Sequence, residues 1–267
     1  MHRVDKGIAG ALIMAFNWIG LWTIVKREQL RTIKIINQVV WPPIISSLLY
    51  ILIFGFAVGK NIELGQVAYF TFLVPGLIMM NVIMSAYEET SSSVFHARFL
   101  NYIQELLIAP LSYWEMIIGY TIGSIIRSFV IGNLILLVFM IFIPIRIHSP
   151  PLYIFFTFMV TIFFASVGLI VALWAERFDN LAVLNTFFIT PLLFLGGVFH
   201  SLKLLPAFFQ KFSFFNPLFY MIDGFRFSML GTSDVNPLYS SLIITILAIA
   251  SFIIAAVLFK KGYKLKI

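Results

Sequence analysis

Long apolar runs separated by short polar stretches dominate the chain, and their length decides what they form. A helix that crosses a membrane needs about 20 mostly apolar residues, and six segments meet this requirement. They are residues 39–58, 67–87, 113–143, 152–174, 181–199 and 239–259. Lipid cannot satisfy a free backbone, and apolar and polar positions do not alternate, so helices are favoured over a β-barrel. The pattern predicts an all-α integral membrane protein with six transmembrane helices.

A different pattern precedes the first span, in residues 17–38. At 100° per residue, Arg27, Arg31 and Lys34 share one helical face. With Gln29 as the exception, the opposite face is apolar: Trp18, Trp22, Val25, Ile33 and Ile36. A helix of this kind lies in the membrane interface. We therefore expect residues 1–38 to form an arm that ends in an amphipathic interface helix.

The largest polar connection, VFHARFLNYIQELLIAPLSYWE, lies between the second and third spans. One helical face carries polar side chains: Arg98, Asn101, Gln104 and Glu105. Another face carries apolar and aromatic side chains: Phe95, Phe99, Tyr102, Ile103 and Leu106. Pro110 stops the helix. The pattern predicts a short amphipathic helix that either offers its polar face to a partner or lies in the interface without one.

Residues 201–238 are apolar but broken by Pro206, Pro217 and Pro237. A re-entrant or interfacial pair of short helices fits such a segment, because irregular backbone is tolerated at membrane depth where protein buries it. Asp223 and Arg226 lie three residues apart and would share a helical face. They either pair locally within a lid packed on the spans or anchor the segment at the headgroups.

Composition excludes a soluble protein, since 61% of the residues are apolar, 11% are charged and the mean hydropathy is +1.02. The cysteine count of zero excludes disulfides and cysteine metal sites. The histidines are scattered and form no H-E-x-x-H motif, so neither a metal site nor a membrane-embedded enzyme is expected. No cleavable signal peptide is expected, because Asn17 interrupts the first apolar patch and no clear cleavage site follows.

The net charge of +7 is concentrated near the chain ends, which indicates membrane topology rather than nucleic-acid binding. With six spans, one side carries Arg3, Lys6, Lys26, Arg27, Arg31, Lys34, Arg98, Arg177, Lys260, Lys261, Lys264 and Lys266. The other side carries only Lys60, Arg146, Lys203, Lys211 and Arg226. The excess predicts that both termini are cytoplasmic and that residues 260–267 form a basic cytoplasmic tail.

One cation, Arg127, lies near the middle of the third span, where a charge is a functional hypothesis by default. Gly119 and Gly123 precede it at spacings of four, so the three share a face that a neighbouring helix can approach closely. Arg127 either lines a translocation path or anchors an anionic substrate group, or else it pairs within its own chain or extends its charge to the membrane interface. Glu88 and Glu89 at the end of the second span are either solvated charges or part of an intracellular relay.

Three stretches carry a resemblance: VPGLIMM, QELLIAPLS and GGVFHSLKLLP…NPLFYMIDGFR. Across nearly its whole length the chain resembles the membrane subunit of an ATP-binding-cassette (ABC) transporter of the type-2 permease family, closest to its small single-domain exporters. The sequence has no phosphate-binding loop of its own. GFAVGKN, from Gly55 to Asn61, has one residue too few between its glycines, and Asn follows the Lys.

The resemblance implies that the QELLIAPLS segment is a coupling helix docking into an ATPase subunit, with contact residues Arg98, Tyr102, Glu105, Leu106, Leu107, Ala109 and Pro110. It implies paired extracellular helices that include Asn216, Pro217, Tyr220, Asp223 and Arg226. It also implies two ATPase chains holding ATP and Mg, and a second permease chain, which is expected to be a copy of this one, with a sister permease as the alternative.

On the same resemblance, the chain is a non-enzymatic permease without a cofactor of its own, in a prokaryotic plasma membrane (the inner membrane of a Gram-negative cell). The translocation path would run between the two permease chains. The expected substrate is a lipid, a lipid-linked polysaccharide or an amphipathic drug. The alternative is a gradient-driven secondary transporter or a channel. We see no convincing repeat of the first three spans in the last three, as such carriers often show.

Overall fold

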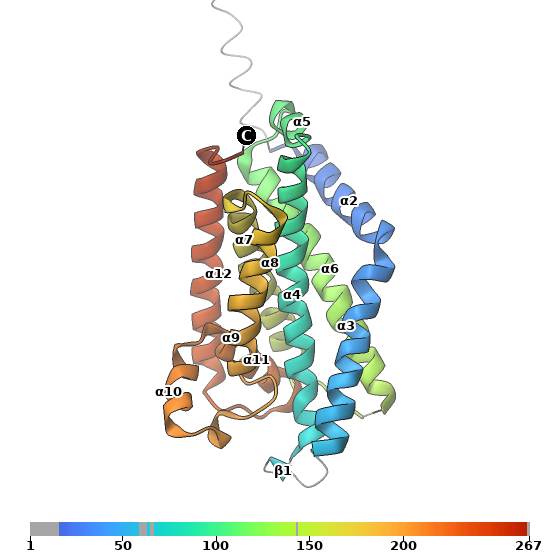
Figure 1. Cartoon of the computed structure of the whole chain (residues 1–267), viewed down its shortest axis with the longest axis vertical. Helices are drawn as coiled ribbons and strands as arrows, with labels where there is room; N and C mark the ends of the chain where they lie inside the picture. The colour runs from blue at the N-terminus through green and yellow to red at the C-terminus, as the bar shows by residue number, and fades with distance from the viewer. Residues whose placement is uncertain (1–15, 59–62, 65–66, 143, 266–267) are drawn as a thin grey trace, which may run out of the picture.

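Six helices of the described chain are long and apolar enough to cross a membrane, and they lie along its longest axis (Figure 1). They are Ile36–Gly55, Tyr69–Phe99, Tyr113–Phe142, Pro150–Trp174, Phe178–Leu195 and Pro237–Lys260. The computed structural model describes residues 16–58, 63–64, 67–142 and 144–265. The predicted all-α membrane protein with six spans is confirmed.

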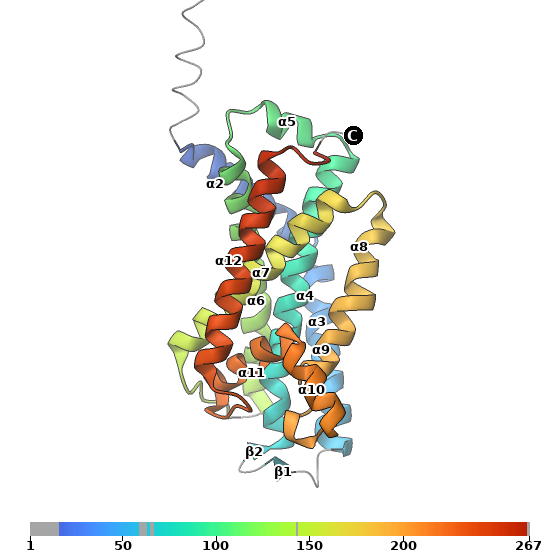
Figure 2. The same cartoon turned by 90° about the vertical axis from the view of Figure 1, so that its left-hand side faces the viewer.

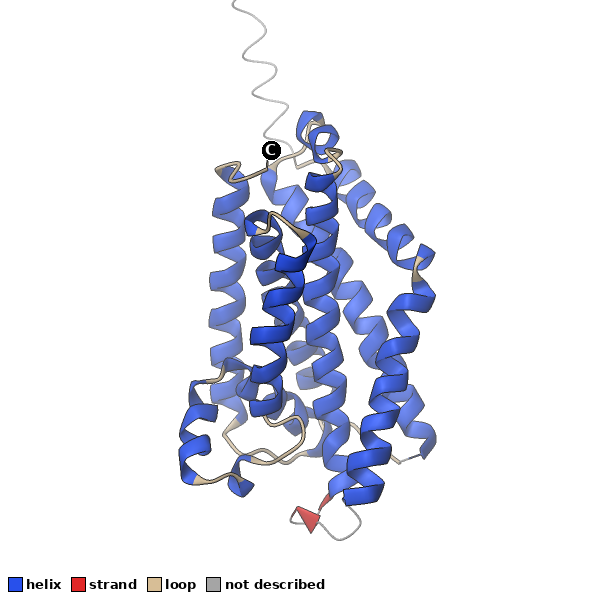
Figure 3. Ribbon diagram, in the orientation of Figure 1, coloured by secondary structure: helices blue, strands red, loops and turns tan. Residues whose placement is uncertain are grey.

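The helices that make up the spans are continuous in some places and segmented in others (Figure 3). They are α3 (Ile36–Tyr50) with a π-helix (Ile51–Val58), α4 (Tyr69–Phe99), α6 (Tyr113–Phe142), α7 (Pro150–Trp174), α8 (Phe178–Leu184) with a π-helical turn (Asn185–Ile189) and α9 (Thr190–Leu195), and α12 (Pro237–Lys260). The shorter elements are α2 (Trp18–Lys34), α5 (Ile103–Ile108), a 3-10 turn (Leu202–Leu204), α10 (Ala207–Phe215) and α11 (Pro217–Leu230). The two-residue strands β1 (Glu63–Leu64) and β2 (Val67–Ala68) pair antiparallel.

Helix α4 lies at the centre of the bundle and packs against α6, α7 and α11. The sequence predicted that this span ends at residue 87, and the helix instead continues to Phe99. The polar residues after position 87 looked like a loop, but Glu89, Thr90 and Ser93 are buried against neighbouring helices. Two of them have polar partners on neighbouring helices that stabilise a longer helix: Thr90 donates to the Ala165 carbonyl at 2.8 Å, and Glu89 pairs with Arg31 and Arg127.

The two ends of the bundle carry different elements (Figures 1 and 2). Helices α2 and α5 and the end of α12 lie at one end, which we call the α5 end. Helices α10 and α11 and the β1–β2 pair lie at the other, which we call the α10 end. This matches the predicted alternation of connections between the spans, and which end is cytoplasmic stays a prediction. Residues used in the sequence argument that lie outside the described part are Arg3, Lys6, Gly59, Lys60, Asn61 and Lys266.

Candidate functional site

Helix α5 forms the tip of the α5 end, and its two faces differ in exposure. Its inner residue Ile103 is buried, and Leu106 and Leu107 are half-buried against the same apolar cluster. Glu105 is exposed, and Ile108 is 84% exposed. Of the remaining predicted contact residues, Tyr102 and Ala109 are half-buried and Pro110 is exposed. The sequence missed Ile108, because an isoleucine among other apolar residues gives no sign of facing outward.

The helix predicted through this segment is interrupted, which changes the position of Arg98. Helix α4 ends at Phe99, and Asn101 has a φ of 62°, a left-handed conformation that Asn tolerates better than most residues. Arg98 therefore lies on α4 rather than on α5, and it is 5% exposed. Its guanidinium donates to the carbonyls of Ala172 and Ala175, where α7 ends. The predicted contact of Arg98 with a partner is thus corrected to an internal contact.

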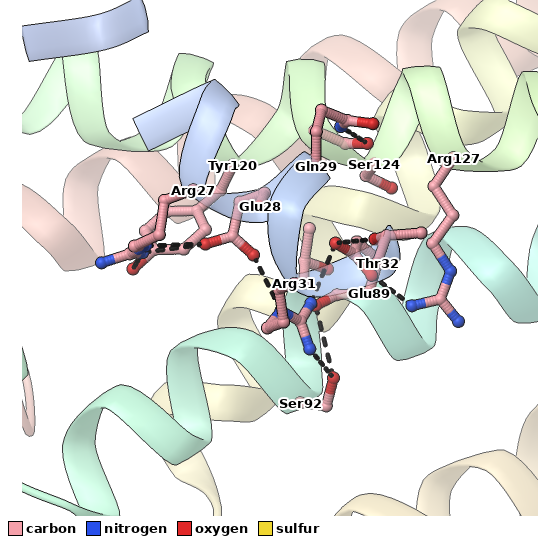
Figure 4. Close-up of polar contacts among 12 residues, drawn as sticks. Arg27, Glu28, Gln29, Arg31, Thr32, Glu89, Ser92, Tyr120, Ser124 and Arg127 are labelled. Atoms are coloured by element: carbon pink, nitrogen blue, oxygen red, sulfur yellow. Dashed lines mark hydrogen bonds and ion pairs between the residues drawn. The ribbon is translucent and has the colours of Figure 1, made fainter. Parts of the chain in front are cut away.

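A network of charged side chains joins the interface helix α2 to α4 and α6 (Figure 4). Its two carboxylates, Glu28 on α2 and Glu89 on α4, are each 1% exposed. Glu28 pairs with Arg27 at 2.8 Å and with Arg31 at 3.2 Å. Glu89 pairs with Arg31 at 2.9 Å and with Arg127 of α6. Arg31 therefore bridges the two carboxylates and joins α2 to α4, and Glu89 extends the network to α6 through Arg127.

Hydrogen bonds extend this network to neutral groups. Arg27 donates to the Tyr120 hydroxyl at 2.8 Å, and its guanidinium lies 5.5 Å from the centre of that ring. The Thr32 hydroxyl donates to Glu89 at 3.3 Å, and Arg31 donates to the Ser92 hydroxyl at 3.3 Å. Buried charges are tolerated when they are paired and hydrogen-bonded, and this network meets that condition.

The structure places the predicted Gly119, Gly123 and Arg127 face against α2. A Cβ added at Gly119 would lie 2.8 Å from Ile24 Cγ2, and one at Gly123 would lie 2.9 Å from Glu28 Cβ. The close approach that the spacing predicted thus occurs, and α2 is the helix that approaches. Arg127 is 7% exposed and paired with Glu89 in its own chain, which is one of the alternatives left open by the sequence.

The N-terminus of α2 is tied to the turn that follows α5. The Asn17 side chain accepts from Gly20 N–H at 2.9 Å, which caps the helix, and donates to the Pro110 carbonyl at 3.2 Å. Glu115, at the start of α6, accepts the backbone N–H groups of Asn17 and Ser112. Helix α2 is therefore connected at its start to the α5–α6 turn and along its length to α4 and α6.

At the α10 end, α11 is packed among the spans instead of floating at the surface. Asp223 is 1% exposed and Arg226 is 2% exposed, which rules out anchoring at the headgroups as their role. Asp223 accepts the backbone N–H groups of Asp234 at 2.9 Å and Val235 at 3.1 Å, in the loop before α12. Arg226 lies 3.8 Å from Asp223 and donates to the Gly197 carbonyl after α9.

The other predicted residues of this segment serve its helix ends. Asn216 caps α11 by accepting from Leu218 N–H at 3.0 Å, and it donates to the Leu192 carbonyl at 2.6 Å. Pro217 occupies the first helical position, where its missing N–H costs nothing. The Tyr220 hydroxyl donates to the Phe214 carbonyl at 3.0 Å. Both predicted short helices are present, and these contacts fix α11 among the spans; we call this buried helix the α11 plug.

Comparison with known proteins assigns this architecture to a family. A model of the ABC-2 type transporter family matches residues 20–230, so the chain belongs to that family. It is 37% identical over 255 residues to the inner membrane transport permease YadH of Escherichia coli strain K12, covering 95% of this chain and 100% of that protein. Together with the six span-length helices, these matches make the chain a multi-pass inner membrane protein.

More distant relatives also match most of the chain. Nodulation protein J of Rhizobium leguminosarum bv. viciae is 25% identical over 260 residues, covering 96% of this chain and 98% of that protein. Nodulation protein J of Sinorhizobium fredii strain NBRC 101917 / NGR234 is 26% identical over 224 residues, covering 80% of this chain and 82% of that protein. The likeness to the first of these relatives thus extends over nearly the whole chain, and the likeness to the second over four fifths of it.

Proposed function

We propose that the chain is the membrane subunit of an ATP-driven exporter, working as a pair of identical permeases with two separate ATPase chains that hold ATP and Mg. Membership of the ABC-2 type transporter family supports an ATPase partner in general. The observation that carries the docking site is α5, whose inner residue Ile103 is buried while Ile108 is 84% exposed. An exposed apolar side chain beside the charged Glu105 suits insertion into a groove of another protein.

The contacts of α2 supply a route from that docking site to the spans. A displacement of α5 acts on the α5–α6 turn, where Pro110 and Glu115 hold the start of α2. Helix α2 then acts on α4 and α6 through the ion pairs of Glu28 and Glu89. ATP shifts the balance between two states of the complex only if nucleotide binds them with different affinity. The contacts that run from α5 through α2 to α4 and α6 would transmit a nucleotide-dependent displacement of α5 to the membrane spans.

The transported substrate is expected to pass between the two permease chains. Arg127, the cation within the third span, is paired with Glu89 of its own chain and so does not need a substrate group as its partner. A groove of about 320 Å³ between α6, α7 and α12 is lined by apolar side chains such as Ile122, Phe158 and Ile249, and its one polar lining residue is Thr121. These apolar surfaces favour an amphipathic substrate: a lipid, a lipid-linked polysaccharide or a drug.

Purification of the tagged chain in a gentle detergent tests the proposal. The expected result is a co-purifying chain with a phosphate-binding loop, ATPase activity, and a particle mass that fits two chains of each kind. Ile108→Lys should release the ATPase chain without unfolding the permease, because the side chain is exposed. Phe215→Lys is the matched control, since Phe215 is 88% exposed on α10 at the opposite end.

A stable permease that never retains an ATPase chain would contradict the exporter proposal. This result would favour the alternative of a gradient-driven transporter. Equal loss of the ATPase chain from Ile108→Lys and Phe215→Lys would preserve the partner but reject the docking site on α5.

A further inference from the structure

A pocket of about 430 Å³ lies between α2, the end of α4 and the residue that precedes α5. Its charged lining consists of Lys26, Arg27, Glu28, Arg31 and Lys34 from α2. Tyr102, immediately before α5, completes the polar lining on the other side. Lys26, Lys34 and the space that they border take no part in the ion pairs that join α2 to α4 and α6.

The charges of this lining do not cancel. Glu28 is the only carboxylate among the lining residues, and Arg27 and Arg31 already share it. Lys26 and Lys34 are exposed and have no ion pair among the described residues. Glu89 adds no balance, because it also neutralises Arg127. The pocket therefore keeps a positive excess that an anion would offset.

The pocket also offers prepositioned donors. Glu28 holds Arg27 at 2.8 Å, and Arg27 lies 5.9 Å from the centre of the Tyr102 ring, so guanidinium and phenol border the same space. The Tyr102 hydroxyl makes no hydrogen bond within the described part of the chain. Burial raises the pKa of Tyr102, so its hydroxyl stays protonated at neutral pH and can donate to an anionic oxygen. Arginine and lysine side chains are the groups that bind phosphate oxygens.

The remaining surface of α2 indicates where such an anion comes from. Leu30 lines the pocket itself, and the outward apolar surface of α2 continues with Trp18, Ile19 and Trp22, which are 71%, 82% and 63% exposed. Tryptophan is typical of the membrane interface, and a helix with one apolar and one basic flank lies in that plane. A free phosphate would contact only the basic flank of α2. A lipid would contact both flanks, with its headgroup on the basic one and its acyl chains on the apolar one.

We propose that this pocket binds the phosphate headgroup of an anionic membrane lipid, with the acyl chains lying against the Trp22 and Leu30 flank. The lipid would join α2 to Tyr102 and so brace the residue that leads into α5. This last consequence rests on the proposed function, because it makes the surrounding leaflet a regulator of ATPase docking. Binding of the lipid itself does not depend on that function.

The test measures lipid binding to the chain purified with whatever partners it retains. Native mass spectrometry would follow titration with dioctanoyl phosphatidylglycerol, with dioctanoyl phosphatidylcholine and inorganic phosphate in separate arms. We expect phosphatidylglycerol to bind more tightly than phosphatidylcholine. The double variant Lys26→Ala/Lys34→Ala should weaken phosphatidylglycerol binding about 30-fold, from roughly 1 kcal/mol per basic residue near a membrane surface.

Two further variants make the result specific. Lys260→Ala/Lys261→Ala removes the same charge from exposed residues at the same end of the bundle, and it should leave binding within about twofold of the unmodified chain. Tyr102→Phe removes only the hydroxyl and should weaken binding by up to about tenfold, as expected for one hydrogen bond to a charged group.

Three outcomes would overturn the proposal. If Lys26→Ala/Lys34→Ala and Lys260→Ala/Lys261→Ala weaken phosphatidylglycerol binding equally, the lipid is attracted by net charge and does not occupy this pocket. Displacement of the lipid by inorganic phosphate at matched concentration would assign the pocket to a soluble anion. Insensitivity to lipid, with the pocket protected only when an ATPase chain is bound, would assign it to the protein partner. Because lipid binding and ATPase retention are read separately, failure of either claim leaves the other measurable.

Discussion

Replacement of Glu89 by glutamine tests the charge network at its centre. Glutamine keeps the shape of the side chain but leaves Arg127, which is 7% exposed, without its counter-charge. Removing one partner of a buried ion pair costs about 3–5 kcal/mol. The second partner of Glu89, Arg31, is 28% exposed and also pairs with Glu28. Its lost ion pair with Glu89 therefore adds little to the loss of stability, because solvent screens the charge. We expect a loss of about 3 kcal/mol, at the lower end of that range.

Thermal unfolding in detergent, followed by intrinsic fluorescence, measures this loss. At about 2–4 °C per kcal/mol for chains of this size, Glu89→Gln should lower the melting temperature by about 6–12 °C. The neighbouring Glu88 is exposed, so Glu88→Gln is the matched control and should shift it by no more than about 2 °C.

A double-mutant cycle separates the ion pair from a general packing defect. Arg127→Met removes the buried cation and replaces it with an apolar chain of similar length, so Glu89→Gln combined with Arg127→Met should melt above Glu89→Gln alone. Two results would contradict a stabilising Glu89–Arg127 pair between α4 and α6. One is a melting temperature of Glu89→Gln equal to that of Glu88→Gln; the other is a double variant whose loss of stability equals the sum of the two single losses.

Three further substitutions probe the contacts that position α2, α11 and α4. Gly123→Leu should displace α2, because a Cβ there would lie 2.9 Å from Glu28 Cβ; protease sensitivity of α2 should rise, and unchanged cleavage would contradict the packing. Asp223→Ala should lower stability by about 3–5 kcal/mol, because it strands Arg226 and two backbone N–H groups; a near-normal melting temperature would reject the plug. Arg98→Met should cost about 1–3 kcal/mol through two lost carbonyl contacts and leave ATPase retention intact, whereas selective release of the ATPase would restore Arg98 to the docking face.

The membrane spans could be predicted from sequence because hydrophobic length is a local property that lipid imposes on each helix separately. The same local rule failed where tertiary contacts changed the environment. Residues after position 87 are polar enough to suggest a loop. They stay helical because Glu89 forms ion pairs with Arg31 and Arg127. The left-handed Asn101 likewise breaks a pattern that an uninterrupted helix would have continued.

The candidate site could be predicted only in part, since its contacts join distant positions. The sequence drew attention to Arg127 through its cost in a membrane and to Glu89 as a relay candidate, but no spacing rule connects them to Glu28. The Asp223–Arg226 pair was predictable because three residues separate its members on one helix. Their burial was not predictable, because it depends on how α11 packs against α4, α7 and α12.

Site-specific photocrosslinking tests the central claim most directly, namely that α5 docks onto an ATP-hydrolysing chain. A photoreactive residue would replace Glu105, which is exposed on α5, and in a matched variant Lys211, which is exposed on α10 at the opposite end. The account predicts a covalent adduct with the ATPase chain from position 105 and none from position 211. Adducts from position 211, or none from position 105 in a complex that hydrolyses ATP, would contradict it.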